Sequence, residues 1–163
     1  MSVEVFVDVK GVDWRLRNLE KLFTLGRMGR FLESDVTLYL QQTVKNRFVD
    51  EGDSASGKWV PLKGRTQMIR GFQGYGTRGP INIRTGKLRS WAATSASKVY
   101  ESSVGITMRY PRTSPGKNTP LGQKIRGAQG MIPGQAARPV IAADSGNLET
   151  ILKMLQGYVE TRL

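Results

Sequence analysis

Few residues of this chain could do chemistry. Its 163 residues include no Cys and no His, so thiolate nucleophiles, the usual general base and the commonest metal ligand are absent. Asp50, Glu51 and Asp53 form the clearest group of carboxylates, and such a group could hold a divalent cation in a nuclease. Their spacing lacks the later ligands of a calcium-binding loop, and the polar run around them favours a helix exit. We therefore expect no enzymatic activity, no metal site and no cofactor.

The segment Thr85-Gly86-Lys87-Leu88 shares letters with a phosphate-binding loop. In that motif another Gly stands five residues before the Gly that precedes the Lys, and Ser or Thr follows the Lys. This chain has Ile81 and Leu88 at those two positions. The sequence therefore argues against nucleotide hydrolysis, and Thr85 is interpreted as the cap of a helical turn that reaches Trp91.

Positive charge is concentrated in the middle of the chain. The net charge is +12, and residues 51–138 hold 15 Lys and Arg against 3 Asp and Glu, whereas both flanking segments are close to neutral. Such a field attracts nucleic acid or an acidic protein surface. If DNA passes through a channel that this protein lines, the candidate charges facing it are Lys63, Arg65, Arg84, Lys87 and Arg89.

Two stretches of this basic middle predict arms that meet a partner. Residues 71–80 interleave four Gly with aromatic and basic side chains, and residues 109–138 are rich in Pro and Gly without one acidic residue. A structureless loop as long as the second is usually functional or disordered, so we expect it to become ordered on a partner. The candidate contact residues are Trp59, Pro61, Phe72, Tyr75, Arg78, Arg109, Arg112, Lys117, Lys124 and Arg126.

Trp59 has two interpretations. A Trp beside Pro61 in an otherwise polar loop usually packs that loop onto the domain. The alternative is an anchor that stacks on a base or inserts into a partner. Packing is the favoured interpretation.

The rest of the chain predicts an α+β scaffold for these segments. Apolar residues recur every three or four positions from Met28 to Phe48, which indicates a helix over residues 27–49. A small antiparallel sheet is expected from residues 3–9, a hairpin at 93–108 and an extended piece near 139–142, packed against long helices. Further helices are expected at 13–25, at 66–70 and from Asp144 or Ser145 to about Arg162, the last burying Leu148, Ile151, Leu152, Leu155 and Val159.

Length and composition fit a single domain over residues 1–163, with flexible arms at about 71–80 and 109–138. No apolar run approaches the ~18 residues of a membrane span. The start of the chain lacks the basic and apolar blocks of a signal peptide. We expect a protein that folds in a cytoplasm without contacting a membrane.

Motifs in the second quarter of the chain resemble those of phage virion morphogenesis proteins, the tail-completion or neck proteins of Mu-like phages. A long helix ending in Phe48 is followed by Gly57-Lys58-Trp59-Val60-Pro61-Leu62-Lys63 and then Thr66. This run is similar to the signature F…G-x-W-x-P-L…T of that family.

Three later blocks follow in the order of the same family and extend the resemblance over roughly residues 28–160. Ile83 to Ser90 is similar to an L-x-x-T-G-x-L block, Val104-Gly105 to a V-x-V-G strand, and Arg138-Pro139 to a closing R-P block. The chain departs from the family after the hairpin, where Pro111-Arg112-Thr113 stands in place of a His-containing stretch.

The resemblance implies a structural virion protein that forms a homo-oligomeric ring, six- or twelve-fold, at the head–tail junction or the head-proximal end of the tail. Such a ring would join or complete the tail, bind other neck, connector and tail proteins, and contact phage DNA transiently. It would be assembled in the host cytoplasm. Ring subunits make heterologous contacts, in which an arm of one subunit grips a different face of the next.

Two alternatives belong to other functional classes. A basic nucleic-acid-binding module of ribosomal-protein type would bind free RNA or DNA as a monomer and release it as salt rises. A metal-dependent nuclease using Asp50, Glu51 and Asp53 would lose activity on substitution of any of the three.

Overall fold

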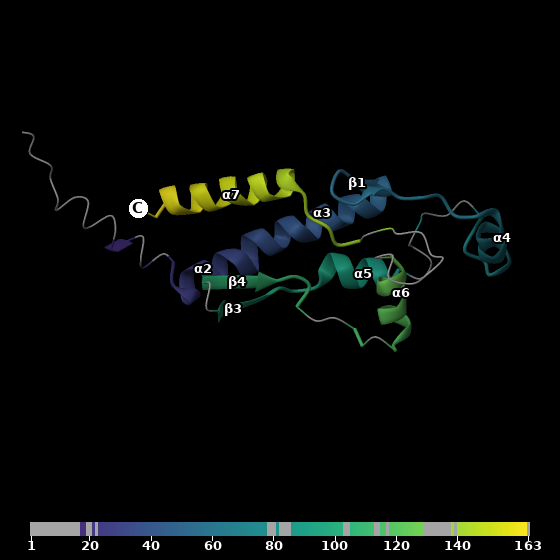
Figure 1. Cartoon of the computed structure of the whole chain (residues 1–163), viewed down its shortest axis with the longest axis horizontal. Helices are drawn as coiled ribbons and strands as arrows, with labels where there is room; N and C mark the ends of the chain where they lie inside the picture. Colours follow the sequence, from purple (N-terminus) through teal and green to yellow (C-terminus); the bar gives the residue numbers. More distant parts are fainter. Residues whose placement is uncertain are drawn as a thin grey trace, which may run out of the picture.

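The computed structural model of the chain describes residues 17–18, 21, 23–77, 81, 86–102, 105–112, 115–116, 118–128, 138 and 140–162. It is a mixed helical and sheet structure, elongated along one axis (Figure 1). The expected α+β class is confirmed at this level. The strand expected at 3–9, and most of the helix expected at 13–25, lie outside the described residues.

One long helical run forms the axis of the molecule. It begins with α2 (Leu25–Phe31), continues through a π-helical segment η1 (Leu32–Val36) and ends with α3 (Thr37–Asp50). The helix expected over residues 27–49 is therefore confirmed. At the π segment, the Thr37 hydroxyl donates to the Leu32 carbonyl at 2.9 Å and lies 2.6 Å from the Ser97 hydroxyl. This buried pair ties the helix to the segment that precedes the hairpin.

Other elements pack on both sides of this helical run (Figure 1). Helix α7 (Ser145–Glu160) lies along one side, and α5 (Lys87–Thr94) with the hairpin β3 (Lys98–Ser102) and β4 (Gly105–Arg109) lies on the other. Two apolar clusters result. The first cluster contains Phe31 and is formed by α2, α7 and β4. The second contains Phe48 and is formed by α3, α5 and Trp59.

The two sheets of the described chain are both two-stranded and antiparallel. The hairpin expected within 93–108 is confirmed, with Val99 opposite Met108. A second sheet, β1 (Gly52–Asp53) with β2 (Gly57–Lys58), was not expected. The strand expected near 139–142 was wrong for residues 140–142, because the carbonyls of Val140 and Ala142 accept hydrogen bonds from the Arg47 guanidinium.

Helix α7 begins as expected but buries a different face. The Asp144 side chain accepts a hydrogen bond from the Asn147 N–H, and the Asn147 side chain accepts one from the Asp144 N–H. The two bonds form a capping box. The expected burial of Leu148 and Leu152 was wrong, because their side chains are 57% and 62% exposed. The helix packs with the side that carries Ile151, Met154, Leu155 and Tyr158.

Helix α6 (Pro120–Ala128) corrects the expectation that residues 109–138 form one structureless arm. Leu121 and Ile125 pack on the core and Ala128 is buried, a spacing of four and three that forms one apolar stripe. Pro120 suits the first position of a helix because a helix leaves that N–H unpaired. The Gly and basic residues between these positions hid the stripe.

Candidate partner-binding arm

The segment from Val60 to residue 80, called the arm below, carries the features that single out a functional surface. Its helix α4 (Gly64–Phe72) lies at one end of the long axis, beyond α3 and α5 (Figure 1). The short helix expected at 66–70 is confirmed, but it is longer than expected. Gly71 and Phe72, assigned above to an irregular stretch, are its last residues.

Glu51 holds both ends of the arm. The Trp59 N–H donates to the Glu51 carbonyl at 2.8 Å, and the Ile81 N–H donates to its carboxylate oxygen Oε1 at 2.9 Å. Glu51 also ends α3, because it adopts a left-handed conformation with φ 52° and ψ 49°. Glu51 thus ends the long helix and fastens both stems of the arm to it. The first stem is the chain that leaves Trp59, and the second is the chain that arrives at Ile81.

Trp59 fixes the first stem to the core. Its side chain is 3% exposed and packs edge-on against Phe48, with ring centroids 5.4 Å apart and an interplanar angle of 82°. The packing interpretation is confirmed, and the ring of Trp59 faces the core instead of a partner. Beyond it, Arg138 donates through Nε to the Val60 carbonyl at 2.8 Å and through NH2 to the Pro61 carbonyl at 3.2 Å. Pro61 itself is exposed.

Arg47 is the buried centre of this attachment, and sequence reasoning missed it. Its Nε donates to Asp53 Oδ2 at 2.7 Å, and its Nη2 lies 2.6 Å from the same oxygen. Its Nη1 donates to the Val140 carbonyl at 2.7 Å, and its Nη2 donates to the Ala142 carbonyl at 3.1 Å. The available signal was its position, because Arg47 falls three residues after Val44 on the apolar stripe of the helix.

The three carboxylates considered for a metal site are used structurally or lie apart. Burial raises the pKa of Asp53, but hydrogen bonds from Arg47 and Ser56 and the Arg47 charge outweigh it, so the pKa lies below its ordinary value. Glu51 binds the arm, and at residue 50 it is the backbone carbonyl that accepts from the Lys58 ammonium. Over the described ranges, no group of three or more potential ligand residues could hold a metal ion. The nuclease hypothesis is therefore wrong in its proposed site.

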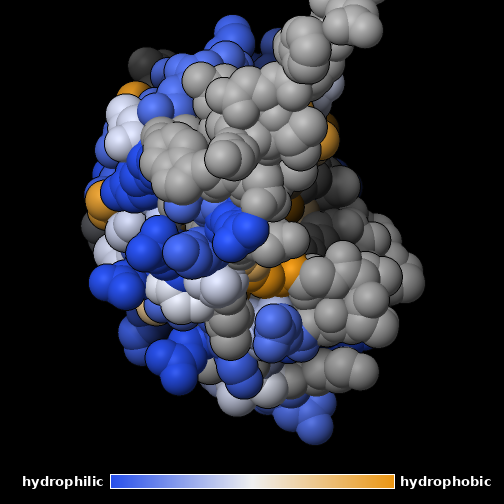
Figure 2. Space-filling view, turned by 90° about the vertical axis from the view of Figure 1, so that its left-hand side faces the viewer, coloured by the Kyte–Doolittle hydropathy of each residue, from blue (hydrophilic) through white to orange (hydrophobic). Residues whose placement is uncertain are grey.

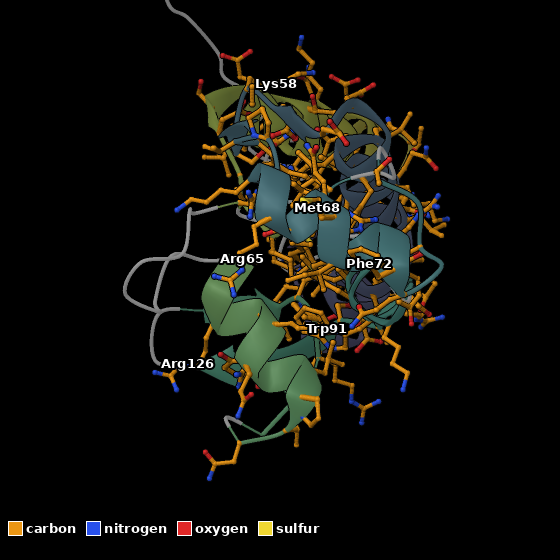
Figure 3. All side chains as sticks on the ribbon, turned by 90° about the vertical axis from the view of Figure 1, so that its right-hand side faces the viewer. Lys58, Arg65, Met68, Phe72, Trp91 and Arg126 are labelled. Carbon is orange, nitrogen blue, oxygen red and sulfur yellow. The ribbon has the colours of Figure 1, made fainter. Side chains whose placement is uncertain are left out.

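Helix α4 is amphipathic in the reverse sense to a helix on a core. Its apolar residues face outward, with Met68 61% and Phe72 88% exposed and Ile69 exposed beside them. Two of its polar residues face inward, since Arg70 is buried and the Gln67 amide donates to the Leu62 carbonyl at 3.0 Å. Figure 3 views this end, with Met68 and Phe72 on α4 in front of α6. An outward apolar face of this kind is typical of a surface that a partner covers.

The other predicted contact residues do not gather on one surface. Tyr75 is 40% exposed just after α4. Arg109 ends β4 and Arg112 follows it, whereas Lys124 and Arg126 are exposed on α6. Arg78 and Lys117 lie outside the described residues.

The predicted channel charges are divided between two elements. Lys63 and Arg65 are exposed at the start of α4, and Lys87 and Arg89 are exposed at the start of α5. Figure 1 separates these two helices along the long axis. Arg84 lies outside the described residues.

Most of the described side chains that are visible at the opposite end of the molecule are hydrophilic (Figure 2). A hollow of about 500 Å³ lies there, where α2 meets the end of α7. Arg162 stacks on the Tyr158 ring, with its guanidinium carbon 3.9 Å from the centroid. The residues that line the hollow are Arg27, Arg30, Phe31, Ser34, Asp35, Tyr158 and Arg162. The hollow is thus lined mainly by polar side chains, whereas α4 at the other end carries exposed apolar ones.

Comparison of the chain with known proteins did not identify a family. The chain matched no family model, no curated protein and no solved structure. In the described part of the chain, no helix combines the length and apolar character needed to cross a membrane.

Proposed function

We propose that this chain is a structural subunit of a phage particle that assembles into a ring at the head–tail junction or the head-proximal end of the tail. The observation that carries the proposal is the arm, which is fastened at both stems and presents an apolar helix face outward. The motif from Gly57 to Thr66, through which the sequence resembles phage virion morphogenesis proteins, runs through the first stem of the arm into α4.

The way the arm is attached favours a fixed assembly surface and not a flexible tether. Phe48, Trp59, Arg47 and Glu51 hold its base through buried packing and hydrogen bonds. A surface that is held in place before binding loses less conformational entropy when a partner docks. An arm at one end of an elongated subunit suits a heterologous contact, which closes into a ring when the rotation between subunits permits.

The charge of the chain supports a second feature of this proposal. Between residues 51 and 138 there are 15 basic residues and 3 acidic ones, and several of the basic ones are exposed on α4, α5 and α6. When subunits are repeated around an axis, charges that are separated within one subunit form rings. A positive ring would attract the backbone of DNA passing through it without reading its sequence.

The first experiment measures the molar mass of the purified full chain by light scattering at physiological salt, with and without double-stranded DNA. The expected result is one discrete oligomer of ring size in the absence of DNA. Replacing Phe72 and Met68 together by Ser should shift the mass toward the monomer, because the outward face of α4 is lost. The matched control is Val49→Ser, which removes a similarly exposed apolar side chain from α3.

The opposite outcomes identify the alternative. A monomer that binds DNA tightly, with an affinity falling steeply as salt rises, would support the basic nucleic-acid-binding module. Unchanged oligomer mass in the Phe72 and Met68 variant would contradict the role given to the arm. Charge-neutralising Lys63, Arg65, Lys87 and Arg89 without effect on DNA association of the oligomer would contradict the channel.

A further inference from the structure

Helix α7 has a second apolar seam beside the one that packs on the core. At about 100° per residue, Leu148 and Leu152 fall on one stripe of the helix, which adjoins Leu155 at the edge of the core contact. The inward stripe, with Ile151, Met154 and Tyr158, lies next to it. Leu148 and Leu152 remain 57% and 62% exposed although the helix has already packed. The apolar surface of α7 is therefore wider than this subunit uses.

The solvent edge of that seam carries two Glu and one Lys, Lys153, by helical spacing. Glu149 and Glu160 are exposed and fall, by helical spacing, on the solvent side of the Leu148 and Leu152 stripe. Over the whole helix the two Glu outnumber the one Lys, at position 153. In a chain of net charge +12, α7 is thus a helix with more acidic than basic residues.

Helix α4 presents the complementary pattern. Arg65, Met68, Ile69 and Phe72 have the spacing of one helix face, and all four side chains are exposed. Residues 58–77 contain four basic residues and no acidic one. Figure 3 places Arg65 on the same helix as Met68 and Phe72 at this end of the molecule. Its face is thus an apolar strip with a basic residue at one end.

We infer that the outward face of α4 docks on the outer seam of α7 in a second copy of this chain. The inference rests on the proposed ring, and it names the surface that receives the arm. Met68 and Phe72 cover Leu148 and Leu152, while Arg65 meets Glu149 or Glu160, depending on the relative direction of the two helices. The two surfaces differ and lie on different parts of the subunit (Figure 1), so each copy gives one arm and receives another.

Cysteine cross-linking in the full chain tests this contact directly, because the natural sequence has no Cys. The variant Met68→Cys/Leu152→Cys should form disulfides between subunits under mild oxidation and give a ladder of covalent oligomers up to the ring. Either single substitution should give none, since α4 does not meet α4 and α7 does not meet α7. The matched control is Met68→Cys/Val49→Cys, whose second position is as exposed but lies on α3.

The outcomes separate this inference from the proposed function. If light scattering finds no oligomer, both fail. If a ring forms but Met68→Cys/Leu152→Cys cross-links no better than the Val49 control, the docking site is wrong and the ring stands. A covalent dimer from Leu152→Cys alone would overturn the contact in favour of α7 packing on α7.

Charge reversal supplies an independent measurement. Arg65→Glu should weaken self-association roughly tenfold, because like charges then face each other across the contact. Adding Glu149→Arg or Glu160→Arg should restore it, and the one that restores it gives the direction of packing. Failure of both second substitutions to restore association would contradict the pairing. Circular dichroism of each variant checks that the helices remain formed.

Discussion

The base of the arm and the tip of the arm treat polar and apolar groups in opposite ways. At the base, the Arg47 guanidinium is fully buried and meets one carboxylate and two carbonyls, while Trp59 is covered by Phe48. At the tip, the apolar side chains of α4 face outward and Arg70 is buried. The difference teaches where stability and assembly reside. The base is completed by contacts within this chain, whereas the apolar side chains of the tip stay exposed in it.

The largest loss of stability is expected from Arg47→Met. This change leaves the Asp53 carboxylate and the carbonyls of Val140 and Ala142 without the donor that satisfies them. Removing one partner of a buried ion pair costs about 3–5 kcal/mol, and urea unfolding of the purified chain measures it. Arg47→Lys is the control, because it keeps the charge but not the planar donor geometry. A loss below about 1 kcal/mol for Arg47→Met would show that the base does not depend on this residue.

Trp59→Ala and Phe72→Ala form a matched pair that divides the two regions. Trp59→Ala empties a buried site and should lower the free energy of unfolding by about 3–5 kcal/mol. Phe72→Ala removes an exposed ring and should change monomer stability by no more than about 0.5 kcal/mol while weakening self-association. Chemical denaturation and light scattering on both variants give the two readouts. Equal effects of the two substitutions on stability would remove the distinction between base and tip.

Glu51→Ala tests the joint between the regions. The change leaves the Ile81 N–H without its carboxylate acceptor, which should cost about 1–3 kcal/mol. It should also loosen the second stem, so that trypsin cleaves faster at Arg65 and Arg70 in the arm. Glu51→Gln keeps an oxygen acceptor, so trypsin should cleave this variant at nearly the rate of the natural chain. Identical digestion of all three proteins would argue against Glu51 as the residue that fastens the arm.

The smallest effect is expected from pH. The pKa of Asp53 in the folded chain lies below its ordinary 3.8 despite burial, because Arg47 and Ser56 stabilise the charged form. The folded state then binds fewer protons than the unfolded one, so this contribution to stability is complete above 3.8 and is lost as pH falls through the folded pKa. Urea midpoints measured between neutral and acidic pH should fall less in Asp53→Asn than in the natural chain.

Asp144 adds to the same acid sensitivity and needs its own control. The Ser54 hydroxyl and the Asn147 N–H hold the pKa of Asp144 below its ordinary value. In Asp144→Asn the acid-dependent loss that belongs to Asp53 should remain. If that variant is as insensitive to acid as Asp53→Asn, the assignment to the Arg47 pair is wrong.

Several elements followed from local pattern alone. The helix from Met28 to Phe48, the capping box at Asp144 and the hairpin around Val99 each depend on the order of residues within one segment. Helix α6 was missed although Leu121, Ile125 and Ala128 carry the same kind of stripe, because Pro, Gly and basic residues dominate that stretch. Here the signal was present and composition outweighed it.

The sequence by itself determined that the segments of α3 and α7 are helical, where the positive charge lies and that Cys and His chemistry is absent. Only the tertiary structure decided that Arg47 is a buried joint, that Glu51 clasps both stems of the arm, and that α4 and α7 turn apolar faces outward. The physical reason is that periodicity shows that a helix has an apolar face but not which other surface covers it. That choice depends on contacts between residues far apart in the chain.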